Sequence, residues 1–334
     1  MRQMKLLEAI GNVDEDLLLH AEITVQHRPR RALRVMIAAA LIAALTLTTV
    51  AVSVGFFGKG NTVANIATGQ GGFAYGDGYI YYGEFGRICR LDLQTGKVKT
   101  FVLEDENTFP MYLFVTQEHI GYVAGYQKLV LMKKDGSSQE VILEGANCSR
   151  LFVDGNILYS DDGEAIRRIN MENGEVTVLA TNTHGYWVDD TYLYALVGNQ
   201  GNVFLRSRKD VVEFEQIELS FYPTAICVDG EDLYITSASS RPRYQVIHYG
   251  EGKETPLPIH SAFVQTLDND LIYLDAVTQN VVKSYDLITG EVTVLLENVH
   301  KFSVLEGRYI CFDLYNEPPV ILDYETGKYI LKNE

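Results

Sequence analysis

Short runs of alternating apolar and polar residues recur from residue 71 to the C-terminus, and each follows a polar turn. The stretch Gly76-Asp77-Gly78-Tyr79-Ile80-Tyr81-Tyr82, followed by Arg90-Leu91-Asp92-Leu93-Gln94-Thr95-Gly96, shows the repeating unit. An acidic turn precedes an aromatic, β-branched strand, and a second strand ends in an Asp-x-x-Thr-Gly turn. This pattern predicts consecutive antiparallel hairpins.

The same unit occurs seven times. The turn before the second strand of each unit reads Gly76-Asp77-Gly78, Thr116-Gln117-Glu118, Asp154-Gly155-Asn156, Asp189-Asp190-Thr191, Asp229-Gly230-Glu231-Asp232, Asp268-Asn269-Asp270 and Glu306-Gly307-Arg308. Units follow one another at about 40 residues, the length of a four-stranded propeller blade. The sequence therefore predicts an all-β chain folded as a seven-bladed β-propeller, with six or eight blades as open alternatives.

The last unit has four strand-like runs of its own, so each blade can be continuous in sequence. The ring would then close in one of two ways. The first and seventh blades could pack against each other, or the apolar run 62–67 could dock as an extra strand. Both alternatives stay open at this point.

An uncharged segment, residues 35–57, precedes the repeats and is 23 residues long. As a helix it would span about 35 Å, enough to cross a hydrocarbon core of about 30 Å. A basic cluster lies on its N-terminal side: Arg28, Arg30, Arg31 and Arg34. The positive-inside rule then places the N-terminus in the cytoplasm and the chain from about residue 58 outside. A cleaved secretory signal is the alternative.

This interpretation divides the chain into a cytoplasmic stub (1–34), a transmembrane helix (35–57), a linker (58–70) and an extracytoplasmic propeller (71–334). Two short helices are expected within the first 22 residues. Leu17, Leu18 and Ala21 would form an apolar stripe on the second. Such a stripe is too small to be a core, so it is a candidate contact for a cytoplasmic partner or a membrane surface.

The charge is unevenly distributed along the chain. The formal net charge is −16, and residues 1–34 carry six basic and five acidic side chains, which leaves −17 for the remainder. An acidic propeller repels phosphate backbones, and this argues against nucleic acid as a partner.

Residue patterns nominate no catalytic, cofactor or metal site. The four cysteines contain no Cys-x-x-Cys pair, the seven histidines share no spacing, and Gly-x-Ser-x-Gly is absent. The one candidate ligand site comes from blade geometry, because the first strands of blades line a propeller's central channel. His184, Tyr186 and Trp187 lie near the predicted start of a blade and are candidate ligand contacts there.

The repeats resemble bacterial propeller domains related to the TolB-like and YWTD-type lipoprotein-receptor propellers, in particular a domain family described as of unknown function. YWTD-type repeats would have Tyr-Trp-Thr-Asp where this chain has Tyr79-Ile80-Tyr81-Tyr82, so the receptor ligand residues are not carried over. Residues 13–21, which precede the basic cluster, resemble a short motif found before the single span of Gram-positive surface proteins, some of them anti-sigma-like. The resemblances imply a membrane-anchored module of bacterial origin.

Together these features favour a single-pass membrane protein that presents a propeller for binding, scaffolding or sensing a protein, peptide or cell-envelope ligand. One alternative is a transmembrane signalling regulator of the anti-sigma-like type, with the propeller as sensor and a cytoplasmic partner at residues 1–22. Another is an extracytoplasmic propeller hydrolase or lyase, although no reaction is indicated.

Overall fold

A computed structural model of the chain describes residues 63–66 and 72–331, apart from 126, 146–149, 199–200, 210, 212, 239–243 and 315–316. The predicted stub and transmembrane helix lie outside the described residues. So do the residues that carry those predictions, namely Arg28, Arg30, Arg31, Arg34, Leu17, Leu18 and Ala21. Within the described part, no helix is long and apolar enough to cross a membrane.

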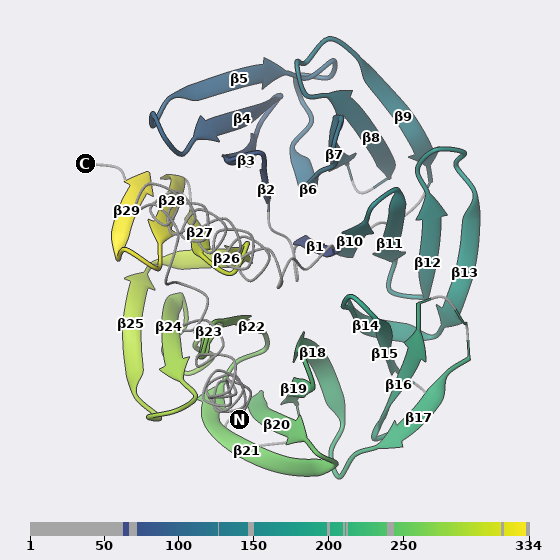
Figure 1. Ribbon diagram of the computed structural model, residues 1–334, viewed down its shortest axis with the longest axis vertical. Coiled ribbons are helices and arrows are strands. Elements are labelled where there is room, and N and C mark those ends of the chain that lie inside the picture. The colour runs from purple at the N-terminus through teal and green to yellow at the C-terminus, as the bar shows by residue number, and fades with distance from the viewer. Residues whose placement is uncertain are drawn as a thin grey trace, which may run out of the picture. The chain divides into compact units, whose positions relative to one another are not determined.

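Seven antiparallel sheets surround a common centre, and each is built from consecutive strands (Figure 1). The first three blades are β2 (Phe73–Gly76), β3 (Tyr79–Glu84), β4 (Arg87–Asp92) and β5 (Val98–Val102); β6 (Pro110–Val115), β7 (His119–Ala124), β8 (Lys128–Lys133) and β9 (Gln139–Glu144); and β10 (Arg150–Asp154), β11 (Ile157–Asp161), β12 (Ala165–Asn170) and β13 (Val176–Thr181).

The fourth and fifth blades are β14 (Thr183–Val188), β15 (Tyr192–Val197), β16 (Val203–Arg208) and β17 (Glu215–Glu218); and β18 (Pro223–Asp229), β19 (Asp232–Ser237), β20 (Gln245–Gly250) and β21 (Lys253–His260). The last two are β22 (Val264–Leu267), β23 (Asp270–Leu274), β24 (Val281–Asp286) and β25 (Val292–Glu297); and β26 (Val299–Leu305), β27 (Tyr309–Leu314), β28 (Glu317–Asp323) and β29 (Lys328–Leu331). The prediction of seven four-stranded blades is confirmed.

The repeated Asp-x-x-Thr-Gly turn has a direct physical cause. Asp92 Oδ1 accepts hydrogen bonds from the N–H groups of Gln94 and Thr95, both at 2.9 Å. Gly96 then takes a φ of 68°, which glycine adopts without the steric cost that a Cβ atom brings. Aspartate thus caps the turn between third and fourth strands, and glycine lets the chain reverse into the outer strand.

The third blade has a fifth strand, β1 (Val63–Ile66), which pairs antiparallel with β10. Because β10 is the innermost strand of its blade, β1 lies on the inner side of that sheet (Figure 1). The apolar run before the repeats therefore docks as an extra strand, one of the two alternatives. It joins the third blade, however, and so does not join the first blade to the seventh.

Side-chain packing closes the ring between the first and seventh blades. Phe73, Ile80 and Tyr82 of the first blade form one buried cluster with Cys311 and Ile321 of the seventh. The rings of Tyr75 and Tyr309 also stack across this seam, with centroids 5.8 Å apart. No strand of the described ring is exchanged between the two blades, so their association depends on burial of these apolar surfaces.

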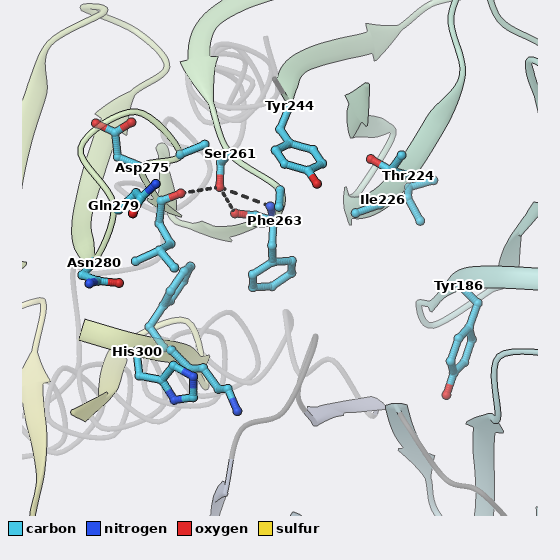
Figure 2. Close-up of a pocket in the computed structure, with 16 residues that line it drawn as sticks. Tyr186, Thr224, Ile226, Tyr244, Ser261, Phe263, Asp275, Gln279, Asn280 and His300 are labelled. Atoms are coloured by element: carbon cyan, nitrogen blue, oxygen red, sulfur yellow. Dashed lines mark hydrogen bonds between the residues drawn. The ribbon is translucent and has the colours of Figure 1, made fainter. Parts of the chain in front are cut away.

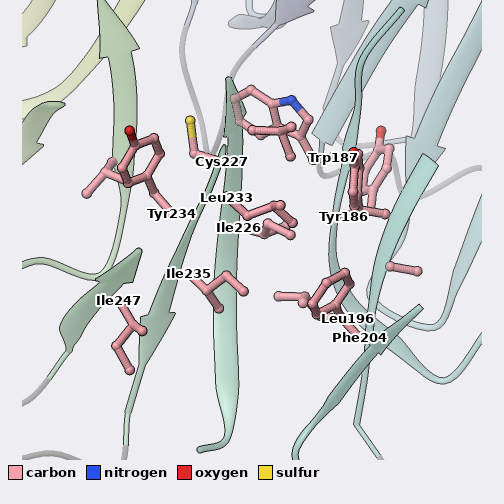
Figure 3. Packing of buried hydrophobic residues seen from close by; sticks show 14 of the residues in the cluster. Tyr186, Trp187, Leu196, Phe204, Ile226, Cys227, Leu233, Tyr234, Ile235 and Ile247 are labelled. Carbon is pink, nitrogen blue, oxygen red and sulfur yellow. The ribbon is translucent and has the colours of Figure 1, made fainter. Parts of the chain in front are cut away.

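The core consists of similar layers between neighbouring blades. Figure 3 shows the layer between the fourth and fifth blades, where Trp187 and Phe204 face Ile226 and Ile235. Aromatic side chains fill much of this space, as their enrichment at strand positions leads one to expect.

Candidate functional site

A pocket of about 560 Å³ lies on the face of the ring where the inner strands begin. Its walls come mainly from blades five, six and seven: the start of β18, the β21–β22 connection, the β23–β24 turn and the start of β26. Figure 2 shows these side chains around a common space. We call it the blade 5–7 pocket. Its lining residues include Tyr186, Thr224, Ile226, Tyr244, Ser261, Phe263, Asp275, Gln279, Asn280, His300, Lys301 and Phe302.

One side of the pocket is apolar. The rings of Phe263 and Phe302 pack against each other with centroids 5.6 Å apart, and Ile226 and Tyr186 add to the lining. The Tyr186 hydroxyl donates to the Tyr159 carbonyl at 2.9 Å, which fixes the orientation of its ring. An apolar wall with a few polar groups is the usual composition of a binding pocket.

Ser261 ties the surrounding connections together. Its side chain is fully buried, and its hydroxyl oxygen lies 2.8 Å from the Leu274 carbonyl oxygen and 3.2 Å from the Phe263 nitrogen. It can donate to the carbonyl and accept from the N–H. The Ser261 N–H donates to the Tyr244 carbonyl at 2.7 Å. Three separate segments of the pocket are thereby held by one residue.

Three lining residues have a left-handed backbone although none is glycine: Tyr244 (φ 66°), Gln279 (φ 53°) and Asn280 (φ 57°). This conformation is unfavourable for side chains with a Cβ atom, most of all for a bulky one such as tyrosine. Hydrogen bonds hold the β23–β24 turn in this form, from Gln279 N–H to the Asp275 carbonyl at 3.0 Å and from Val299 N–H to the Asn280 carbonyl at 2.9 Å. Strained residues often cluster at functional sites, and three of the ten left-handed non-glycine residues of the described chain gather around this pocket.

Asp275 is buried at the edge of the pocket and has its charge compensated. Its Oδ1 accepts from the Val277 N–H at 2.9 Å, and its Oδ2 accepts from the Thr278 hydroxyl at 2.9 Å and from the Lys283 ammonium. Burial alone would raise the pKa of Asp275, but these hydrogen bonds, led by that from Lys283, hold it below its ordinary value. Asp275 is therefore a structural anion that braces the turn.

The start of β26 brings two basic side chains to the pocket. His300 Nδ1 lies 3.7 Å from Asp313 Oδ2. Lys301 is half-buried, and burial lowers its pKa while attraction to Asp313 partly opposes the shift. The site thus combines aromatic rings, amide groups and a partly dehydrated cation.

The residues predicted from the sequence occupy different places. Tyr186 lines the pocket, whereas Trp187 is 6% exposed and packs edge-on against Phe152, with ring centroids 5.3 Å apart. His184 stacks on Tyr222 at 5.6 Å, and its Nε2 lies 2.9 Å from the Pro223 carbonyl oxygen. Neither of these two is among the residues that line the blade 5–7 pocket. Whether any of the three contacts a ligand stays a prediction.

Sequence reasoning missed the rest of the pocket. The Asp275–Asn280 turn and the Ser261–Phe263 connection match no motif, and they are at least 20 residues from the lining residues of β18 and β26. The one hint of the pocket in the sequence is that residues 275–280 are mostly polar and contain no glycine, whereas several turns of the repeat contain one. A strained turn is detectable once φ is known, not from residue types alone.

The described residues offer little for metal or thiol chemistry. Among them, no group of three or more His, Cys, Asp or Glu residues is arranged to hold a metal ion. Burial raises the pKa of the Cys227 thiol to about 12 and that of Cys311 further, so both stay protonated at neutral pH. Such thiols are inert core side chains, not nucleophiles.

Comparisons with known proteins identify the fold and no family. Neither a known protein family nor a curated protein matches the sequence. Solved structures do match. PorZ, an essential bacterial surface component of the type-IX secretion system of Porphyromonas gingivalis, aligns over 78% of this chain at 13% identity with a TM-score of 0.59. The chain spans only 38% of the length of that protein.

Two further structures have comparable similarity. A chain of the mitotic checkpoint complex aligns over 75% of this chain and 87% of its own, at 11% identity with a TM-score of 0.56. YCF48, solved with a D1 peptide bound, aligns over 76% of this chain and 89% of its own, at 11% identity with a TM-score of 0.51. At such identities the comparisons show the propeller fold alone, and a fold by itself does not define a function.

Proposed function

We propose that this chain is a membrane-anchored, extracytoplasmic binding module that receives a protein or peptide ligand in the blade 5–7 pocket. The observation that carries the proposal is the pocket itself, where three left-handed non-glycine residues and a buried serine hold a mixed apolar and polar cavity in place. A rigid ring that displays strained connections is suited to ligand binding.

The neighbouring folds support a macromolecular ligand. YCF48 was solved with a peptide, and another propeller chain belongs to the mitotic checkpoint complex. Propellers with no detectable sequence relation to this chain thus bind peptides or enter assemblies. The uncharged residues 35–57 and the arginines before them support anchoring, with the propeller on the outer side.

The binding proposal is tested by blocking the pocket. Ala276 lines it, and a tryptophan there should fill part of the cavity. In a cross-linking capture from cells, we expect Ala276→Trp in the full chain to lose partners that the wild type retains. The matched control is Ile288→Trp, which adds the same ring at a side chain 76% exposed in the β24–β25 turn, at the opposite end of the same blade. Equal capture by both variants would refute the pocket as the binding site.

The orientation is tested by cysteine labelling of intact cells. Val277 is 61% exposed, while Cys89, Cys227 and Cys311 are buried and so protected from a maleimide. With Cys148 changed to serine, a membrane-impermeant maleimide should label Val277→Cys in intact cells. The matched variant Gln3→Cys should react only after lysis. The reverse result would contradict an outside propeller.

A further inference from the structure

Lys301 is the pocket cation without a contacting anion. It is half-buried on β26, and Asp313 is its cross-strand neighbour, yet their charged atoms are not at ion-pair distance. In residues 72–331, as far as the structure describes them, no acceptor lies within hydrogen-bond or ion-pair distance of the Lys301 ammonium. A partly dehydrated ammonium in this position has lost water without gaining a protein acceptor, so an anionic ligand group would stabilise it.

The remaining charges of the pocket do not oppose an anion strongly. Asp275 is the lining carboxylate, and both of its oxygens are occupied by the donors of its own turn and by Lys283. His300 faces Asp313 at 3.7 Å. Asp313 attracts Lys301 without contacting it, so the Lys301 ammonium is the lining cation still open to an acceptor from a ligand.

An apolar surface adjoins this cation. Phe302 follows Lys301 directly on β26, and its ring packs against Phe263. Both rings and Ile226 line the same pocket. A ligand that meets Lys301 with an anionic group can thus place an apolar group against this wall at the same time, where its burial adds affinity.

We propose that the blade 5–7 pocket binds a carboxylate carried on an apolar group, such as the C-terminal residue of a peptide that ends in phenylalanine or leucine. The carboxylate pairs with Lys301, and the apolar group packs against Phe263 and Phe302. This inference rests on the proposed function and specifies the chemistry of its ligand. A free fatty acid offers the same chemistry, so the test separates the two sources.

The test uses the full chain in detergent and three probes. These are acetyl-Gly-Gly-Phe with a free carboxylate, the same peptide with a C-terminal amide, and decanoate, each titrated by isothermal calorimetry. The carboxylate peptide should bind the wild type at least about tenfold more tightly than the amide, because only the carboxylate can form an ion pair with the Lys301 ammonium. Lys301→Met should abolish this preference. Lys328→Met, the same change at an exposed lysine of the seventh blade, should keep it.

Circular dichroism melts of both variants separate lost folding from lost binding. The inference is overturned if the wild type binds acid and amide equally, or if neither carboxylate probe binds at millimolar concentration. Lys301-dependent binding of decanoate without binding of the peptide supports the carboxylate chemistry and assigns a free acid as the source. The two proposals can fail separately. If the probes do not bind but Ala276→Trp abolishes partner capture, the proposed function stands and only the ligand chemistry is refuted.

Discussion

Gly121 is a position where adding one methyl group should destabilise the fold measurably. It lies on β7 opposite Phe114 of β6, and the phenylalanine side chain is fully buried. A Cβ atom at residue 121 would lie 2.0 Å from the Phe114 Cζ and 2.3 Å from both Cε atoms. In the third blade the corresponding pair is Phe152 and Tyr159. In the second blade a glycine replaces the tyrosine, and the ring of the facing phenylalanine occupies the space over that glycine.

Two effects of Gly121→Ala oppose each other. Overpacking a core costs about 1–3 kcal/mol of the free energy of unfolding. Replacing glycine by alanine restricts the unfolded chain, which should raise the free energy of unfolding by about 0.4–1 kcal/mol. This gain applies because the φ of residue 121 is not positive, so alanine can adopt it. The steric cost should exceed this gain, because the Phe114 ring is fully buried over the paired strands and has no free space to move into. We expect a net loss of about 1–2 kcal/mol, measured from denaturant midpoints.

A double-mutant cycle tests the stated cause. Phe114→Leu alone should be destabilising through lost volume, but combined with Gly121→Ala it should cost less than the sum by about 1 kcal/mol or more. Gly198→Ala is the matched control, because its added Cβ would meet no atom closer than 3.7 Å and its φ is not positive. Additive single effects, or a Gly121→Ala variant as stable as the control, would refute the argument.

Three further predictions address closure, charge and strain. Ile321→Ala should cost about 2–4 kcal/mol and raise amide exchange mainly in strands β2–β5 and β26–β29, because packing alone closes that seam; uniform exchange around the ring would contradict this. The pKa of Asp323 is lowered mainly by its hydrogen bond from Arg308, so stability from this pair is present above about pH 4 and lost as pH falls through the lowered pKa. Arg308→Met should cost about 1 kcal/mol at neutral pH, and its difference from wild type in acid denaturation should vanish below that range. Gln279→Gly and Asn298→Gly should both raise the denaturant midpoint, since each relieves a left-handed residue, but only Gln279→Gly should weaken pocket binding.

Much of the fold could be predicted from the sequence because turn chemistry repeats in this chain. Asp92 and Gly96 act through the backbone of their own turn, as do Asp286 and Gly290, so neighbouring residues contain all the information needed. Register and blade continuity follow from such local signals. The docking of β1 on β10 is different, since it joins segments about 90 residues apart with no complementary motif in either.

The pocket could not be predicted for the same reason. Its lining residues are separated in sequence and meet only because blades five to seven are neighbours in the ring. Trp187 shows the same limit for a residue that the sequence did nominate as a ligand contact. It lies on a first strand, as the repeat predicts, but its ring is buried against Phe152 of the third blade and is not among the residues that line the pocket.

Positions where the chain departs from the repeat are the first candidates for a functional role. Turns that serve only the ring can use glycine for a left-handed residue, as Gly96 and Gly290 do. In the blade 5–7 pocket that conformation is held by Tyr244, Gln279 and Asn280, each of which costs stability that glycine would save. Left-handed non-glycine residues also occur in turns between first and second strands, at Asp77, Asp268 and Glu306, so this conformation alone does not mark a binding site. Tyr244, Gln279 and Asn280 are distinguished by lining one cavity, where they offer the proposed ligand side chains that glycine lacks.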